Sequence, residues 1–150
     1  MKENLITELR RQSQSYAYTS IKMHEAVARK AGFSGTDHKY LGFFLQKGQM
    51  TAGELASLTG LTTGAVTGLI DRFEKKNLVI RRYSEGDRRK VIVIPKTERI
   101  MALLAPLYEE FRFKMEKLAA SLSEDELKTI AAYFEKSIKI MTETIDDLKE

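Results

Sequence analysis

The chain has 150 residues, 43% of them hydrophobic, and a net charge of +4. This length fits one ordinary domain or two small modules, and the apolar content excludes a disordered chain. There is no cysteine, which excludes disulfides, thiolate metal sites and thiol-based redox sensing. The charged amino terminus and the lack of an apolar run of about 18 residues argue against a secretory signal and a membrane span, so we expect a soluble, cytoplasmic protein.

The amino-terminal part predicts two helices. Apolar residues recur at helical spacing from about residue 5 to residue 31, and Gly32 then provides a stop. A second helix is expected over residues 37–47, with Thr36 as its cap and Gly48 as its stop.

A helix-turn-helix pattern follows. Thr51 and Glu54 have the spacing of a capping box at the start of a short helix. A break at residues 59–61 contains a glycine, and another helix begins at Thr62 or Thr63 and runs to about Lys76. Asn77 suits the left-handed position that ends a helix.

The next segment predicts a β-hairpin. Residues 78–83 and 90–94 are the two candidate strands. The second is strongly β-branched, which favours a strand. The polar turn over residues 84–89 contains Gly86. A two-stranded hairpin is marginal alone, so it should pack on the preceding helices.

Two long amphipathic helices are expected to complete the chain. The first is capped by Thr97, runs to about Leu122 and should kink at Pro106. The second starts at a Ser123–Glu126 capping box and carries apolar residues every three or four positions as far as Leu148. These stripes could pack on each other as an intramolecular hairpin or on a second copy. We favour a homodimer, because two helices this long and this apolar have little to pack on in a small chain.

Positive charge is concentrated in one short segment. Residues 72–90 hold eight basic and three acidic side chains, so this window carries +5 and the rest of the chain carries −1. Such a cluster is typical of a phosphate-binding surface, although a solvated charged hairpin would have the same composition.

The helix over residues 62–76 has the features of a DNA recognition helix. Away from its apolar stripe its residues are small and polar, which would let its amino-terminal end approach base edges in the major groove. Gly64 and Gly68 each cost about 0.5–1 kcal/mol of helix stability relative to alanine. Close approach to DNA would explain that cost, and room for a neighbouring helix is the alternative for Gly68. The candidate DNA-binding residues are Thr62, Thr63, Gly64 and Thr67 for bases, and Arg72 and Lys75 for the phosphate backbone.

The hairpin tip is expected to reach the minor groove. That groove is narrow and electronegative, and an extended arginine such as Arg89 fits it. Asp87 could hold the Arg89 guanidinium by a charge-assisted bond, and Arg88 lies between them.

Three segments together resemble the MarR family of bacterial and archaeal regulators: residues 51–56, residues 60–72 and residues 86–93. The resemblance covers nearly the whole chain and is most specific over about residues 36–97. It implies one MarR-like domain that is mainly α with a small β-hairpin wing: a DNA-binding lobe at about 36–96 and dimerisation helices at about 1–35 and 97–150. It further implies a triangular dimer that binds double-stranded DNA, Arg89 in the minor groove, and repression relieved by a small phenolic or anionic ligand.

Other sites have weaker signals. An aromatic ligand could lie in a cleft between the dimerisation helices and the DNA-binding lobe, although most of the aromatic side chains could equally be plain core. The candidates are Tyr16, His24, His38, Phe43, Tyr108 and Phe111. Two histidines on different helices do not make a convincing metal site, so no metal or cofactor is expected. The sequence contains no recognisable nucleophile or acid–base motif, so we do not expect an enzyme. The competing interpretation is a winged-helix module that binds protein or RNA.

Overall fold

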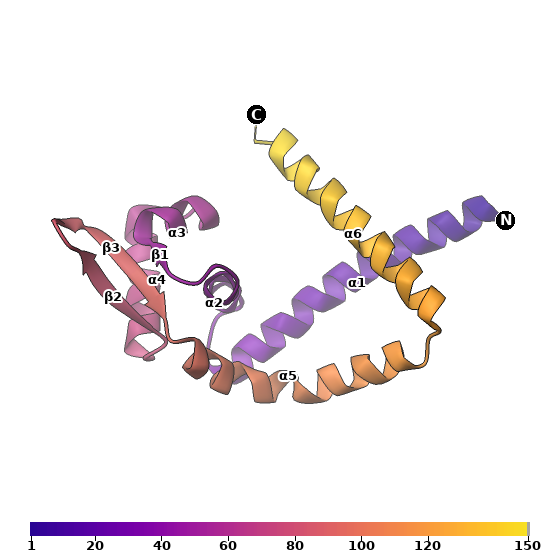
Figure 1. The fold of residues 1–150 in the computed structure, drawn as a ribbon, viewed down its shortest axis with the longest axis horizontal. Helices are drawn as coiled ribbons and strands as arrows, with labels where there is room; N and C mark the ends of the chain where they lie inside the picture. The colour runs from indigo at the N-terminus through magenta and orange to yellow at the C-terminus, as the bar shows by residue number, and fades with distance from the viewer. Residues whose placement is uncertain (150) are drawn as a thin grey trace. The chain divides into compact units, whose positions relative to one another are not determined.

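The computed structural model describes residues 1–149, which form helices and a small antiparallel sheet (Figure 1). In chain order the elements are α1 (Lys2–Ala31), α2 (Gly35–Lys47), β1 (Met50–Thr51), α3 (Ala52–Thr59), α4 (Thr63–Lys75), β2 (Val79–Ser84), β3 (Asp87–Pro95), α5 (Thr97–Ala120) and α6 (Glu124–Asp147). The predicted fold class, mainly α with a β-hairpin wing, is confirmed. The chain divides into two units, Met1–Tyr108 and a second that begins at Glu109, and each is described by itself.

Local capping interactions set the ends of most helices. The capping boxes at Thr51–Glu54 and Ser123–Glu126 are both present, as predicted. Asn77 has a φ of 58° and ends the turn after α4, also as predicted. The expected cap of α2 was wrong: Ser34, not Thr36, accepts a hydrogen bond from the Asp37 amide at 3.1 Å. This shift lengthens α2 by two residues at its start.

The boundaries of α5 also differ from the prediction. Thr97 is the first residue of α5 and not its cap, since the carbonyl of Lys96 accepts the Arg99 and Ile100 amides. The helix ends at Ala120, two residues before Leu122. Pro106 lies inside α5, and the kink expected there stays a prediction.

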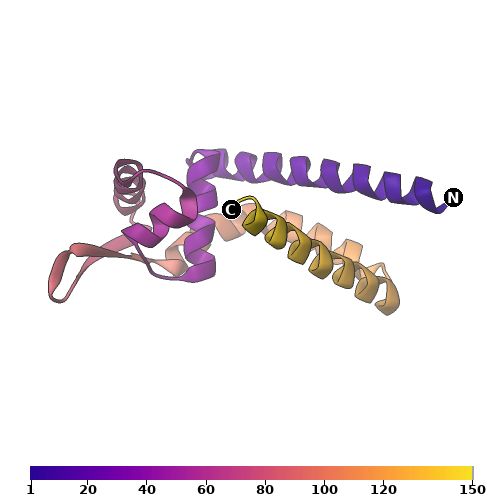
Figure 2. The same cartoon turned by 90° about the horizontal axis from the view of Figure 1, so that it is seen from above.

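The sheet has the order β1–β3–β2, with both pairings antiparallel. The two residues of β1 pair with Val93 and Ile92 and add a strand that the sequence did not predict. The hairpin turn closes with Ser84 opposite Asp87, and Gly86 takes a φ of 93° that other residues rarely adopt. The tip of the β2–β3 hairpin extends beyond the helices of the first unit in both views (Figures 1 and 2).

The core of the first unit lies between α2, α3, α4 and the sheet. Phe73 of α4 is fully buried and meets Phe33 and Phe44 edge-on, with ring centroids 6.3 Å from each. Ile100 and Leu104 of α5 belong to this buried cluster. They are therefore part of the lobe's own core, although their place in a long apolar stripe had indicated the dimer surface.

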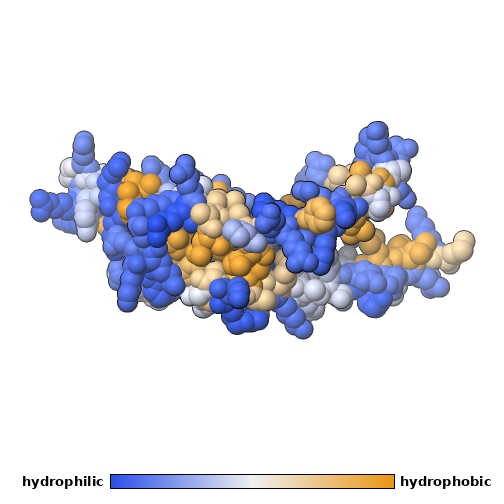
Figure 3. Space-filling view, turned by 90° about the horizontal axis from the view of Figure 1, so that it is seen from below, coloured by the Kyte–Doolittle hydropathy of each residue, from blue (hydrophilic) through white to orange (hydrophobic). Residues whose placement is uncertain are grey.

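The second unit contains the end of α5 and all of α6, and its apolar side chains are exposed. No described residue of α6 is buried. The predicted stripe is present on α6: Leu127, Ile130, Phe134, Ile138, Met141 and Ile145 are each 38–57% exposed. Figure 3 shows patches of hydrophobic residues (orange) among hydrophilic ones (blue) on one face of the molecule. Within residues 1–149, no helix is long and apolar enough to cross a membrane.

Candidate nucleic-acid interface

The amino-terminal end of α4 presents the small polar face that the sequence predicted. Thr62 is the cap, and its hydroxyl accepts a hydrogen bond from the Ala65 amide at 3.2 Å. Thr63, Gly64 and Thr67 are all exposed. The Thr67 hydroxyl donates to the Thr63 carbonyl at 3.0 Å, so it remains free to accept a hydrogen bond from outside. The opposite face is buried, which turns these threonines toward solvent.

The two glycines of α4 are not required by packing within the described chain. A Cβ built on Gly64 would meet no atom within 4 Å, and one built on Gly68 would meet only the Arg72 guanidinium at 3.6 Å. The alternative explanation for Gly68, room for a neighbouring helix of the same subunit, is therefore wrong within residues 1–149. Both glycines weaken an exposed helix face without an internal reason.

Arg72 forms an ion pair with α2, although its side chain is 54% exposed. Its Nε and Nη2 donate to the two carboxylate oxygens of Asp37 at 2.8 and 2.9 Å. The Asp37 side chain is only 11% exposed, and this bidentate pair raises the pKa of Arg72. Lys75, one turn further on, is exposed and has no ion-pair partner among residues 1–149. The two cations predicted to contact the DNA backbone therefore have different surroundings.

A second ion-pair cluster joins the wing to α4. Arg81 of β2 donates from Nη1 to Glu74 at 2.8 Å and from Nη2 to Asp71. Its side chain is 20% exposed. Burial lowers the Arg81 pKa, but the two carboxylates outweigh this effect and the pKa is raised. The sequence analysis missed this cluster, because the three charges lie in two different elements.

The wing tip carries the exposed cations. Arg88, Arg89 and Lys90 are exposed at the start of β3, and no ion pair engages them within the described residues. The orientation expected for Asp87 was wrong: its carboxylate accepts the Arg89 backbone amide at 2.9 Å and not the guanidinium. Aspartate readily accepts a hydrogen bond from the amide two residues ahead in a turn, and this local bond is the one present here. Asp87 thus shapes the turn, and the Arg89 side chain has no ion-pair partner within residues 1–149.

The eight cations of residues 72–90 therefore fall into two groups. Arg72 and Arg81 form ion pairs, and Lys76 donates to the Gly32 carbonyl at 3.2 Å. The cations without such a bond in the described chain are Lys75, Arg82, Arg88, Arg89 and Lys90. Arg72 and Lys76 are exposed as well, so the two groups differ in their bonding and not in their exposure alone.

Three of the predicted ligand residues converge in the first unit. The Tyr108 hydroxyl of α5 lies 2.6 Å from His24 Nδ1 of α1 and 3.2 Å from His38 Nε2 of α2. The two imidazole rings stack with centroids 6.0 Å apart. Burial and the nearby His24 lower the pKa of His38, and burial raises the pKa of Tyr108. A cavity of about 420 Å³ adjoins the histidines, and Glu25 and Lys39 also line it.

The other ligand candidates do not join this cluster. Tyr16 is 59% exposed on α1. Phe43 is half-buried and packs against Tyr40 at 5.9 Å between ring centroids. Phe111 belongs to the second unit and is 39% exposed. In residues 1–149 no three histidine, aspartate or glutamate side chains gather as metal ligands.

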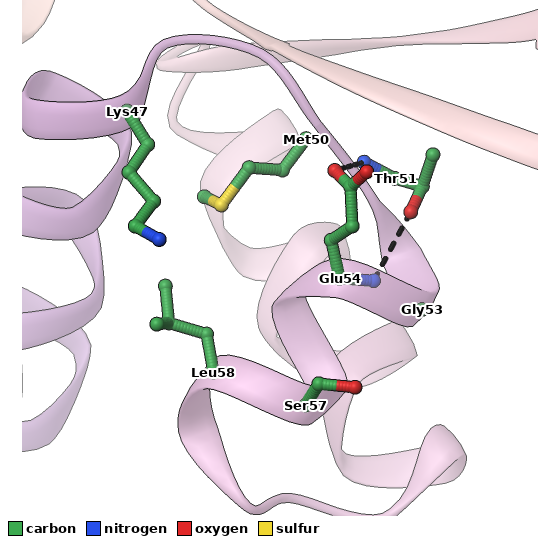
Figure 4. Close-up of a pocket in the computed structure, with 7 residues that line it drawn as sticks. All are labelled: Lys47, Met50, Thr51, Gly53, Glu54, Ser57 and Leu58. Carbon is green, nitrogen blue, oxygen red and sulfur yellow. Dashed lines mark hydrogen bonds between the residues drawn. The ribbon is translucent and has the colours of Figure 1, made fainter.

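Another hollow, of about 700 Å³, lies beside the start of α3 (Figure 4). Lys47, Met50 and Leu58 line it. Its carboxylate, Glu54, is occupied by the capping box, accepting the Thr51 amide at 3.0 Å while Thr51 accepts the Glu54 amide. Among the described residues that line it, Lys47 is therefore the one cation without an ion-pair partner, and no pair of reactive groups is present.

A helix-turn-helix followed by a hairpin that docks on the second helix defines a winged helix-turn-helix fold. The MarR family model matches residues 36–91. YcgE, an uncharacterized HTH-type transcriptional regulator of Bacillus subtilis, is 37% identical over 134 residues, which are 87% of this chain and 84% of YcgE. The chain belongs to the MarR family of transcriptional regulators.

Solved structures have the same fold. A MarR family protein from Bacillus stearothermophilus matches with a TM-score of 0.71 and 24% identity, covering 95% of this chain and 99% of that one. A mutant of MepR from S. aureus, solved bound to an oligodeoxyribonucleotide, matches with a TM-score of 0.56 and 21% identity, covering 87% and 97%. Both likenesses extend over the helices on either side of the wing.

Proposed function

We propose that this chain is a homodimeric repressor that binds a pseudo-palindromic DNA site and is released by a small anionic or phenolic ligand. The observation that carries the proposal is the pairing of an exposed small-residue face on α4 with a wing tip whose arginines have no partner among the described residues. Thr62, Thr63, Gly64 and Thr67 would contact bases in the major groove.

The wing would provide the second contact. Arg89, whose backbone amide bonds Asp87 and whose guanidinium has no ion-pair partner within residues 1–149, would enter the minor groove, with Arg88 beside it. Lys75 would bind the phosphate backbone. Arg72, which the sequence analysis also assigned to the backbone, bonds Asp37 instead.

A second copy would cover the exposed apolar stripe of α6. Six large apolar side chains at helical spacing, each more than a third exposed, make a surface that a monomer does not normally leave open. A symmetric pair would place two recognition helices in successive major grooves, with half-site centres roughly 10 base pairs apart.

The effector would bind in the cavity beside His24 and His38. Its volume of about 420 Å³ is within the usual range for small-ligand sites, about 300–1,000 Å³. Lys39 and the two imidazoles could donate to a carboxylate or phenolate. An effector must bind free protein more tightly than DNA-bound protein. Calorimetry with aromatic carboxylates and phenols that gave equal affinity for both forms would remove this part of the proposal.

The central test is selection of duplexes from a random library with the full chain, followed by footprinting. We expect an enriched inverted repeat protected on both halves, and binding that an excess of structured RNA does not compete away. Enrichment of nothing, or effective competition by RNA, would favour a protein- or RNA-binding winged helix over a repressor. Light scattering should give about twice the 17.1 kDa chain mass.

A further inference from the structure

Two adjacent residues of α4 bond to two different elements of the first unit. Arg72 bonds Asp37 of α2, and Asp71 bonds Arg81 of β2. We propose that Asp37 and Arg81 are positioning residues for DNA recognition, which brace α4 against α2 and against the wing. This inference rests on the proposed function, because it assumes that α4 reads DNA.

Asp37 has few alternatives to this bond. It is 8% exposed and is the buried charged residue of the core within residues 1–149. A buried carboxylate is costly unless it is paired and hydrogen-bonded. Arg72 satisfies both of its oxygens in the planar, two-bond geometry that lysine cannot reproduce. If Arg72 turned toward a phosphate, Asp37 would be left buried and unpaired.

Arg81 braces the other contact. In addition to its bonds to Glu74 and Asp71, the Arg81 guanidinium donates from Nη2 to the main-chain carbonyl of Thr67 at 3.5 Å. The backbone amide of Arg81 also donates to the Glu74 carboxylate, at 3.3 Å. Thr67 is one of the residues expected to contact bases. A single side chain of β2 thus bonds three successive turns of α4, so the angle between the wing and the recognition helix depends on it.

The chain provides a matched control for each brace. Lys75 lies one turn after Arg72 on α4, and Arg82 follows Arg81 on β2; both are exposed cations with no ion-pair partner in the described chain. If the proposal is right, the paired cations contribute geometry and the unpaired ones contribute charge. These roles have different signatures, since geometry affects sequence discrimination and charge affects salt dependence.

The test measures dissociation constants over a series of KCl concentrations for the library-selected duplex and for a scrambled duplex of equal length. We expect Arg72→Gln and Arg81→Gln to weaken binding to the selected duplex by about tenfold, with little change on the scrambled one and an unchanged salt slope. Lys75→Gln and Arg82→Gln should weaken both duplexes, and each should reduce the slope by about one unit.

Milder variants keep the test decisive if a glutamine variant unfolds. Arg72→Lys keeps the charge but loses the two-bond geometry, so a positioning role predicts nearly the loss seen with Arg72→Gln. Asp37→Asn should cause a similar loss, and the Asp37→Asn/Arg72→Gln double variant should bind no worse than either single one. Circular dichroism under assay conditions confirms which variants are folded.

Two results would overturn the inference. One is a flatter salt slope for Arg72→Gln with full rescue by Arg72→Lys, which would make Arg72 a phosphate contact. The other is unchanged discrimination in both Arg72→Lys and Arg81→Lys. If the unmodified chain failed to discriminate the selected from the scrambled duplex, the proposed function itself would fall instead, so the two failures are distinguishable.

Discussion

The first unit contains a buried apolar core, whereas none of the described residues of α6 in the second unit is buried. Phe44, Phe73 and Leu41 are 0–1% exposed in the lobe, whereas Phe134 and Ile138 of α6 are 48% and 57% exposed. The lobe thus has a core supplied by its own chain, while α6 has an apolar stripe that residues 109–149 leave exposed. Under the proposed homodimer, the lobe would be stabilised within the subunit and α6 by association.

The largest expected effect tests the lobe's core. Phe73→Ala removes a fully buried ring that contacts Phe33 and Phe44, and it should cost about 3–5 kcal/mol of unfolding free energy. Urea unfolding followed by circular dichroism measures it. Tyr83→Ala is the control, because Tyr83 is an aromatic residue of the same unit that is 59% exposed. Equal losses for the two variants would mean that the lobe has no distinct core.

The next prediction tests the α6 stripe. Ile138→Lys should break the dimer, because association would bury an unpaired charge. Light scattering should then give a mass near 17.1 kDa, while the lobe keeps its unfolding transition. Ala132→Lys adds the same charge on the other face of α6 by helical periodicity, and it should remain dimeric. A dimeric Ile138→Lys protein would show that the partner surface lies elsewhere.

For Leu104, the apolar periodicity of the sequence indicated the dimer surface, but the residue is buried in the lobe's core. Ile100, Leu104 and Phe111 share one helical stripe in the sequence, but the first two are buried in the lobe and Phe111 is 39% exposed. Periodicity states which face of a helix is apolar, not what covers it. A charge at Leu104 should therefore unfold the lobe and not selectively separate the subunits.

The helix-turn-helix, the capping boxes and the hairpin could be predicted because they depend on neighbouring residues. Thr51 and Glu54 are three positions apart, and the geometry of the first helical turn brings them together. The Asp37–Arg72 bond could not be predicted, since its partners are 35 positions apart and meet only through the packing of α2 on α4. The same applies to β1, which has two residues and exists only because β3 lies beside it.

The wing tip should show a smaller effect, confined to DNA binding. Arg89→Ala should weaken operator binding by about tenfold and flatten the salt dependence by up to about one unit. Unfolding and dimer mass should be unchanged, since Arg89 is exposed and its side chain has no ion-pair partner within residues 1–149. Arg89→Lys should recover part of the affinity. Binding as tight as that of the parent would mean that the wing does not read DNA.

The smallest expected effect is the pH dependence of the His24–Tyr108–His38 cluster. Burial and the nearby His24 lower the pKa of His38 in the folded lobe below its ordinary value of 6.5. As the pH falls below 6.5, the unfolded chain therefore binds more protons at His38 than the folded lobe does. The contribution of His38 to stability is fully present above that pH and is lost progressively below it. His24 and His38 are the chain's only two histidines.

Urea unfolding at pH 7.5 and 5.5, at one protein concentration, should show a loss of unfolding free energy on acidification, and His38→Gln should reduce that loss. His24→Gln should also reduce it, because the His38 pKa then rises toward its ordinary value. Tyr108→Phe keeps the packing but removes the hydroxyl between the rings, and so separates hydrogen bonding from burial. Equal acid losses in the parent and the two histidine variants would show that this cluster does not couple protonation to folding of the lobe.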